Sequence, residues 1–252
     1  MARAADLRAD PQAGSDRRRR DVRNVQHGDR DDPRGRSARC SGGRHGDRRS
    51  RAPSRARPGG LPLRLGVCVS GEGTNLRNLV ELDFDVVAVA TNRPSCAGAA
   101  FARERGIALA ELPQKIFDSA EQRDIAMRDF FLRRDVELVV DAGFDRIHTQ
   151  PFLDAFVGRI INVHPSLLPE FAGGMDAIEQ ALTSGATRTG ATVHVVTADL
   201  DAGPILLQEA VPVLDGDTLE TLRVRVHEAE YRILPRSIRM MEERLANSPS
   251  FR

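Results

Sequence analysis

Hydrophobic residues between positions 61 and 252 fall into short runs that alternate with stretches of helical spacing. A run such as Val86–Ala90 is continuously apolar and rich in β-branched residues, which is typical of a strand buried on both faces of a sheet. The pattern predicts strands at Leu63–Val69, Val86–Ala90, Ile107–Leu112, Glu137–Asp141, Arg159–His164, Ala191–Thr197 and Ile205–Val213. It predicts helices at Asn75–Leu82, Cys96–Arg105, Ala120–Arg134, Ala177–Ser184 and Thr218–Leu245.

The order of these elements predicts an α/β fold. Strands and helices that alternate at this rhythm favour a doubly wound, mostly parallel sheet of the Rossmann-like kind. The last two strands are separated by a short connection and are expected to pair as neighbours. Residues 61–252 are therefore expected to form a single domain.

The first 60 residues differ in composition from the rest of the chain. They contain 17 Arg and 8 Asp but no Lys or Glu, a net charge of +9, whereas the remainder has 20 basic and 28 acidic residues, a net charge of −8. So few apolar residues cannot offset the entropy of ordering a chain. We expect residues 1–60 to be a disordered extension, either translated from a mis-assigned start or a tail with weak affinity for polyanions.

Several classes of protein are excluded by what the chain lacks. No apolar run approaches the ~20 residues that span a bilayer, and no apolar secretory signal stands at the N-terminus. Cys40, Cys68 and Cys96 have no metal-ligand spacing, and an odd number of cysteines suits no disulfide framework. The acidic globular part argues against nucleic acid as a partner. We expect a cytoplasmic protein, a monomer or homodimer, without metal, membrane or nucleic-acid partner.

The turn after the first strand has the chemistry of an anion site. Ser70–Asn75 contains two glycines and leads directly into a helix, so that backbone N–H groups and the helix dipole can face an anion. The dinucleotide fingerprint fails, because Leu76 replaces its third glycine and Thr91-Asn92 replaces its acid. The loop suits a monophosphate better than NAD or ATP; the alternative is a tight turn with a polar cap.

Polar residues at the end of the fifth strand suggest acyl-transfer chemistry. Asn162 and His164 share one face of the strand, and Pro165 ends its hydrogen-bond ladder, which places both at the carboxyl end where α/β sheets bind ligands. An amide can hold an oxyanion while an imidazole moves a proton. A structural, hydrogen-bonded His164 is the alternative. Asp199 or Asp201 could supply a carboxylate that favours the imidazolium, and spacing does not choose between them.

Four segments together resemble a known family. Ser70–Asn75, Ala142–Ile147, Asn162–Pro169 and Asp199–Pro204 follow, in order, the motifs of folate-dependent phosphoribosylglycinamide formyltransferases, in the folate formyltransferase superfamily. The resemblance covers residues 63–245. It implies the Rossmann-like formyltransferase fold, 10-formyltetrahydrofolate as co-substrate and glycinamide ribonucleotide as acceptor of the formyl group in purine biosynthesis.

The resemblance also implies roles for individual residues. The catalytic residues are Asn162, His164 and Asp201. The implied ribonucleotide ligands are Gly73, Thr74, Asn75 and Glu230, and the implied folate-binding residues are Asp145, Arg146, Ile147, His148, Asn162 and Ala120.

The chain departs from the family pattern in several places. Ala120 replaces a common Arg, although Arg123 is near, and Asp145 and His148 replace a common Met and Leu. The segment 171–176 is one residue longer than the pattern, and His227 stands where a Lys is frequent. Two further residues are expected to be structural: Arg123 on a solvated helix face and His194 in a strand.

Other functions share this catalytic logic. A methionyl-tRNA formyltransferase resembles a longer chain with a basic C-terminal domain. A formyltetrahydrofolate hydrolase transfers to water and resembles a chain with an N-terminal regulatory domain. From other classes, the chain could be a non-catalytic nucleotide-binding module, or bind RNA through its arginine-rich arm.

Overall fold

The computed structural model describes residues 62–174 and 176–247, so the expectations for residues 1–60 lie outside the described residues. The strands are β1 (Leu65–Val69), β2 (Val86–Thr91), β3 (Ala108–Glu111), β4 (Leu138–Asp141), β5 (Ile160–His164), β6 (Arg188–Val195) and β7 (Ile205–Pro212). The helices are α1 (Thr74–Glu81), α2 (Ala97–Glu104), α3 (Ala120–Leu132), α4 (Gln150–Ala155), α5 (Ala177–Thr183) and α6 (Leu219–Ala246), with a 3₁₀ turn at Gln114–Ile116.

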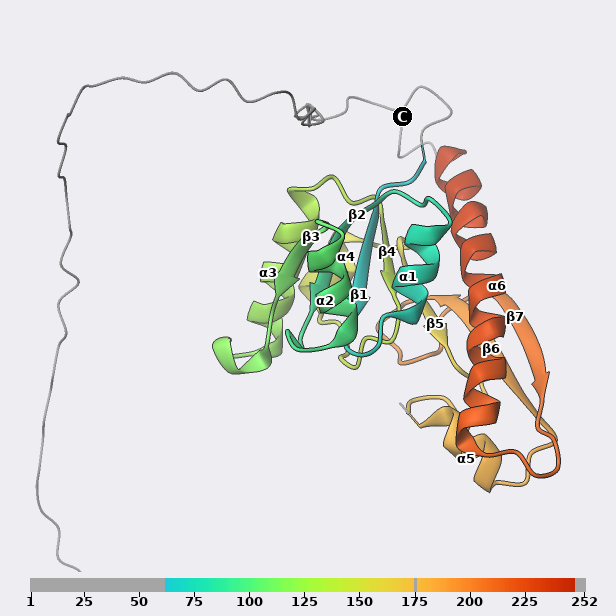
Figure 1. Ribbon diagram of the computed structural model, residues 1–252. Coiled ribbons are helices and arrows are strands. Elements are labelled where there is room, and N and C mark those ends of the chain that lie inside the picture. The colour runs from blue at the N-terminus through green and yellow to red at the C-terminus, as the bar shows by residue number, and fades with distance from the viewer. Residues whose placement is uncertain (1–61, 175, 248–252) are drawn as a thin grey trace, which may run out of the picture. The chain divides into compact units, whose positions relative to one another are not determined.

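All of these strands belong to one sheet, in the order β3-β2-β1-β4-β5-β6-β7 (Figure 1). The first five strands run parallel, whereas β6 is antiparallel to both β5 and β7. This mostly parallel α/β sheet confirms the predicted fold class, and β6 and β7 pair as expected. The chain leaves β1 for one side of the sheet and later returns to add β4 on the other side, so the loops after β1 and β4 diverge. A crevice at such a switch point is where α/β sheets bind ligands.

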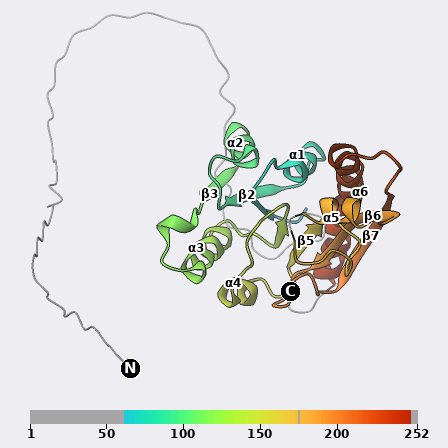
Figure 2. The ribbon, with the colours of Figure 1, turned by 90° about the horizontal axis from the view of Figure 1, so that it is seen from below.

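Helices cover both faces of the sheet. Figure 2 shows α1 and α2 on one side and α3 and α4 on the other. Alternation along β1 divides its side chains between these layers: Leu65, Val67 and Val69 join the core under α1, α2 and α6, whereas Cys68 joins the core under α3 and α4. Long α6 packs against β6 and β7, and therefore carries residues along the antiparallel end of the sheet to the binding edge.

Local sequence explains where three of the described α-helices begin. Cys96 Sγ, Ser119 Oγ and Thr218 Oγ1 each accept a hydrogen bond from the backbone N–H three residues on, which caps α2, α3 and α6. Among the described residues, no helix is long and apolar enough to cross a membrane.

The structure differs from the predicted elements at three places. Helix α4 and the 3₁₀ turn at Gln114–Ile116 were not predicted, because six and three residues are too few to show a helical period. Strand β6 begins at Arg188, three residues before the predicted start, since it continues to pair with β7 as far as Pro212. The predicted start is later because Arg188 and Thr189 are polar and lack the apolar pattern that predicts a buried strand.

Candidate active site

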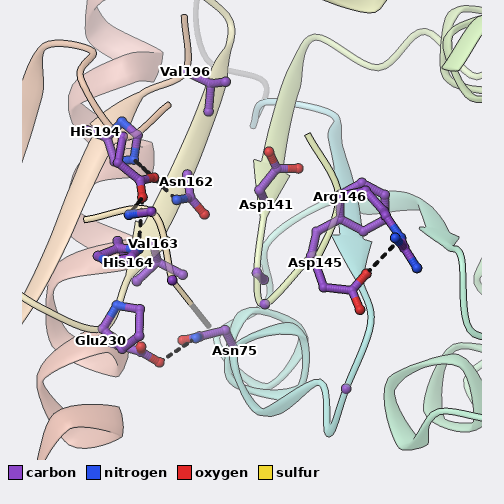
Figure 3. A pocket seen from close by; sticks show the side chains of 18 of the residues that line it. Asn75, Asp141, Asp145, Arg146, Asn162, Val163, His164, His194, Val196 and Glu230 are labelled. Carbon is purple, nitrogen blue, oxygen red and sulfur yellow. Dashed lines mark hydrogen bonds and ion pairs between the residues drawn. The ribbon is translucent and has the colours of Figure 1, made fainter. Parts of the chain in front are cut away.

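A single pocket of about 660 Å³ collects the polar residues that end the central strands. Its walls come from the loops after β1, β4 and β5, the connection between β6 and β7, and α6. Figure 3 shows Asn162, His164, His194 and Glu230 on one side, with Asn75, Asp141 and Asp145 across from them. The pocket therefore lies at the switch point between β1 and β4 and extends over β5.

The turn after β1 forms one end of the pocket. Gly73 has φ +68°, in the left-handed region, and a Cβ there would lie 2.5 Å from Cα of Gly98 in α2. Both constraints require glycine, so the turn packs against α2 and opens the N-terminus of α1 toward the pocket. Thr74 and Asn75, the first residues of α1, line the pocket beside Gly73. The backbone N–H groups that the sequence predicts to bind an anion are therefore at the pocket.

Helix α6 completes the same end. Asn75 Nδ2 donates a 2.8 Å hydrogen bond to Glu230 Oε2, and His227 and Arg223 line the pocket one and two turns earlier on α6. Burial raises the pKa of Glu230 to about 7, although the hydrogen bond from Asn75 opposes the shift. Burial and the positive charge of Arg223 lower the pKa of His227. The carboxyl and the imidazole thus both favour their neutral forms here.

Glu230 should make the free protein less stable as the pH rises. A carboxyl whose pKa is about 7 when folded and 4.5 when unfolded holds its proton more tightly in the native state. Native stability therefore falls between pH 4.5 and 7, by on the order of 3 kcal/mol. We expect Glu230→Gln to unfold at higher urea than the wild type at pH 8 and at a similar urea concentration at pH 4. An equal difference at the two pH values would contradict the buried, neutral Glu230.

Asn162, His164 and Asp201 come together in the middle of the pocket. Nδ1 of His164 lies 3.6 Å from Asp201 Oδ2, and Nε2 of the same ring lies 3.1 Å from the carbonyl oxygen of Phe171. Asn162 Nδ2 lies 3.2 Å from Nε2 of His194, which is itself 3.5 Å from Asp201 Oδ1. Both acid candidates, Asp199 and Asp201, line the pocket, and these contacts select Asp201.

The Asp201 carboxylate is held in its charged form. The hydrogen bond with His194 is the largest cause of its lowered pKa, and a 2.8 Å hydrogen bond from the Gly173 N–H and the charges of His164 and His194 act in the same direction against burial. His194, predicted to be a structural residue, lies between Asn162 and Asp201. The sequence around His194 alternates with apolar residues and gives no sign of these two contacts, because Asn162 and Asp201 belong to other parts of the chain.

The segment 145–148 forms the opposite wall. The Asp145 carboxylate accepts a 2.7 Å hydrogen bond from Asn92 Nδ2 and pairs with Arg93, while its backbone N–H donates to Ser70 Oγ. Asp145 therefore ties together the loops after β1, β2 and β4. Ile147 is 65% exposed at the pocket, whereas His148 is buried.

Arg123 is buried against this segment and hydrogen-bonds to it. The prediction that Arg123 lies on a solvated helix face is therefore wrong. Its side chain is buried, 2.7 Å from Asp124 Oδ1, and its Nη2 donates to the Ile147 carbonyl. Asp124 in turn accepts a 2.5 Å hydrogen bond from the Thr149 N–H. Ala120, at the first turn of α3, is not among the residues that line the pocket, and its folate contact stays a prediction.

Comparison with known proteins agrees with this geometry. Residues 63–238 match the model of the formyl transferase family. The chain is 42% identical over 182 residues to a phosphoribosylglycinamide formyltransferase of Mycobacterium tuberculosis, covering 70% of this chain and 84% of that protein. The crystal structure of glycinamide ribonucleotide transformylase 1 from Symbiobacterium toebii superposes with a TM-score of 0.70 at 41% identity, covering 72% of this chain and 88% of the other.

Longer relatives match over one part only. The chain is 40% identical over 184 residues to the trifunctional purine biosynthetic protein adenosine-3 of Bos taurus, and spans 18% of that protein's length. The match covers 71% of this chain, so the similarity is to one portion of a protein with several activities.

Proposed function

The chain belongs to the formyl transferase family, and from that premise we propose that it transfers the formyl group of 10-formyltetrahydrofolate to the amine of glycinamide ribonucleotide. The products are formylglycinamide ribonucleotide and tetrahydrofolate, a step of purine biosynthesis. The observation that carries the proposal is the meeting of Asn162, His164 and Asp201 in one pocket with the anion-binding turn at Gly73–Asn75.

The two ends of the pocket suit the two substrates. The phosphate of the ribonucleotide binds the backbone N–H groups of Gly73–Asn75, with Glu230 beside the ribose and Arg223 adding positive charge. The folate lies along the segment 145–148, where hydrogen bonds from the Asp145 N–H to Ser70 and from Arg123 to the Ile147 carbonyl fix the backbone, and the remaining backbone polar groups of the segment contact the pterin ring. The reacting amine and formyl carbon then meet near Asn162 and His164.

The central residues supply the chemistry. The amine attacks the formyl carbon, and a tetrahedral oxyanion forms between the Asn162 amide N–H and the protonated His164 imidazole. Nε2 of His164 is the donor, because Nδ1 faces Asp201. The bond between the formyl carbon and the folate nitrogen then breaks as a proton passes to that nitrogen from His164 or a bound water, and the proton lost by the attacking amine restores the donor. Asp201, whose pKa is lowered by its contacts, provides the negative charge that stabilises the imidazolium.

The test is whether tetrahydrofolate release depends on the acceptor. The purified chain is mixed with 10-formyltetrahydrofolate, with and without glycinamide ribonucleotide, and release is followed by absorbance. We expect release only when the ribonucleotide is present. Equal release without it would identify a hydrolase, and release with methionyl-tRNA alone would identify the other acceptor.

The same assay tests the domain boundary. We propose that residues 61–252 contain all groups needed for this reaction, since every residue assigned above lies in that range. A chain starting at Leu61 should therefore keep the full-length turnover. Loss of activity in a correctly folded shortened protein would give residues 1–60 a role.

A further inference from the structure

Three buried side chains with metal-binding donors meet beside the pocket, next to the strand that carries Asn162. Cys68 comes from β1, Asp141 ends β4, and His148 follows in the next loop. Their donor atoms all lie within 4.8 Å of one another, and Nε2 of His148 is 2.9 Å from Asp141 Oδ2. No metal-ligand spacing marks them in the sequence, because the ligands come from separate elements.

We propose that Cys68, Asp141 and His148 form a binding site for one divalent transition-metal ion of the zinc class. A thiolate, an imidazole and a carboxylate are the three donors that zinc takes in proteins, and this mixed set does not suit magnesium or calcium. The proposal does not rest on the formyl-transfer function. The metal ion would be a ligand in addition to the two proposed substrates.

Aromatic packing holds the His148 ring at this cluster. The ring is stacked between Phe144 and Phe152, with centroids 5.4 and 4.3 Å away. Its Nδ1 is buried and meets no hydrogen-bond partner among the described residues, whereas Nε2 faces Asp141. The imidazole is therefore fixed in orientation with Nε2 toward the other two donors.

The charges of the three donors suit a divalent ion. A Cys68 thiolate and the Asp141 carboxylate together carry two negative charges, and a neutral His148 imidazole adds none. Metal binding would form S–metal, N–metal and O–metal bonds, break the S–H bond of Cys68 and release its proton to water. The occupied site then has no net charge.

The pocket provides access to the site. Asp141 and His148 line the pocket, whereas fully buried Cys68 lies behind them. An ion held by these three side chains would have a fourth position for water or a small ligand, as in zinc sites with three protein ligands. Asp141 ends β4 and is paired in register with Asn162 on β5, so the ion site would neighbour the proposed oxyanion site (Figure 3).

Cobalt titration tests the proposal directly. The full chain carrying Cys40→Ser and Cys96→Ser has Cys68 as its one thiol, so a thiolate-to-cobalt charge-transfer band can arise only there. After removal of metals with a chelator, we expect Co²⁺ to produce this near-ultraviolet band, to saturate at one equivalent, and to be displaced by Zn²⁺. Zn²⁺ should also raise the melting temperature of this protein.

Matched variants separate the site from adventitious binding. Cys68→Val should abolish the band, and His148→Leu should weaken cobalt binding at least about tenfold. His227→Asn, in the same pocket but outside the cluster, should leave the cobalt titration unchanged. Circular dichroism verifies that each variant is folded. A folded parent protein without the charge-transfer band, or equal weakening by His148→Leu and His227→Asn, would overturn the proposal.

Discussion

His164→Ala is expected to lower kcat for formyl transfer by about 10²–10⁴-fold, because the variant loses the group proposed to stabilise the oxyanion and move the proton. The affinity for glycinamide ribonucleotide should change little, since the contacts proposed for its phosphate and ribose come from other pocket residues, Gly73–Asn75 and Glu230. Steady-state assays with both substrates, and calorimetric titration with the ribonucleotide alone, measure the two effects separately.

The substitution leaves a small space at the end of β5, so folding must be verified independently. Nε2 of His164 contacts the Phe171 carbonyl in the free protein, and the melting temperature reports whether loss of this contact matters. A folded His164→Ala protein that keeps the wild-type kcat would remove the catalytic role of His164. That result would favour the alternative function, a non-catalytic nucleotide-binding module with the same pocket.

Arg123→Leu is expected to destabilise the protein by about 3–5 kcal/mol, because it leaves the Asp124 carboxylate buried without its ion partner. Both side chains are at most 3% exposed, and Arg123 Nε donates a 2.8 Å hydrogen bond to Asp124 Oδ1. The lost hydrogen bond to the Ile147 carbonyl should also loosen the segment 145–148 and raise KM for the folate more than KM for the ribonucleotide. Urea denaturation measures the free energy of unfolding.

The same helix offers a matched control. Arg128 and Asp129 form an adjacent ion pair of the same kind at 2.8 Å, but their side chains are 30% and 42% exposed. Solvent screens such a pair, so Arg128→Leu should cost no more than about 1 kcal/mol. In addition, Asp124→Asn combined with Arg123→Leu should recover part of the lost stability, since the amide oxygen can still accept from Thr149 N–H. If Arg123→Leu and Arg128→Leu lowered the free energy of unfolding equally, burial of the Arg123–Asp124 pair would not contribute to stability.

The sequence predicted the fold and most of the pocket because their signals are local. Strands such as β2 are unbroken apolar runs, and Asn162 and His164 alternate on one strand. Contacts between residues that are far apart in the chain have no local sequence pattern from which they could be predicted. Arg123 is one of two arginines on α3, and what distinguishes it from Arg128 is its burial with Asp124 and its hydrogen bond to the Ile147 carbonyl in the loop after β4. His194 reads as one polar residue in an apolar strand, until β6 pairs with β5 and brings it beside Asn162.

The central place of β1 in the sheet has a consequence for the order of folding. Strand β1 pairs with β2 and β4, and its contact with β4 joins Arg64 to Glu137, 73 residues later in the chain. Local β1–α1–β2 pairing requires much shorter loops, and loop-closure entropy makes long-range pairing slow. A partly folded chain can therefore hold the anion-binding turn before Asn162, His164 and Asp201 are in place. Ribonucleotide added during refolding would then protect amide hydrogens of α1 ahead of those of β5.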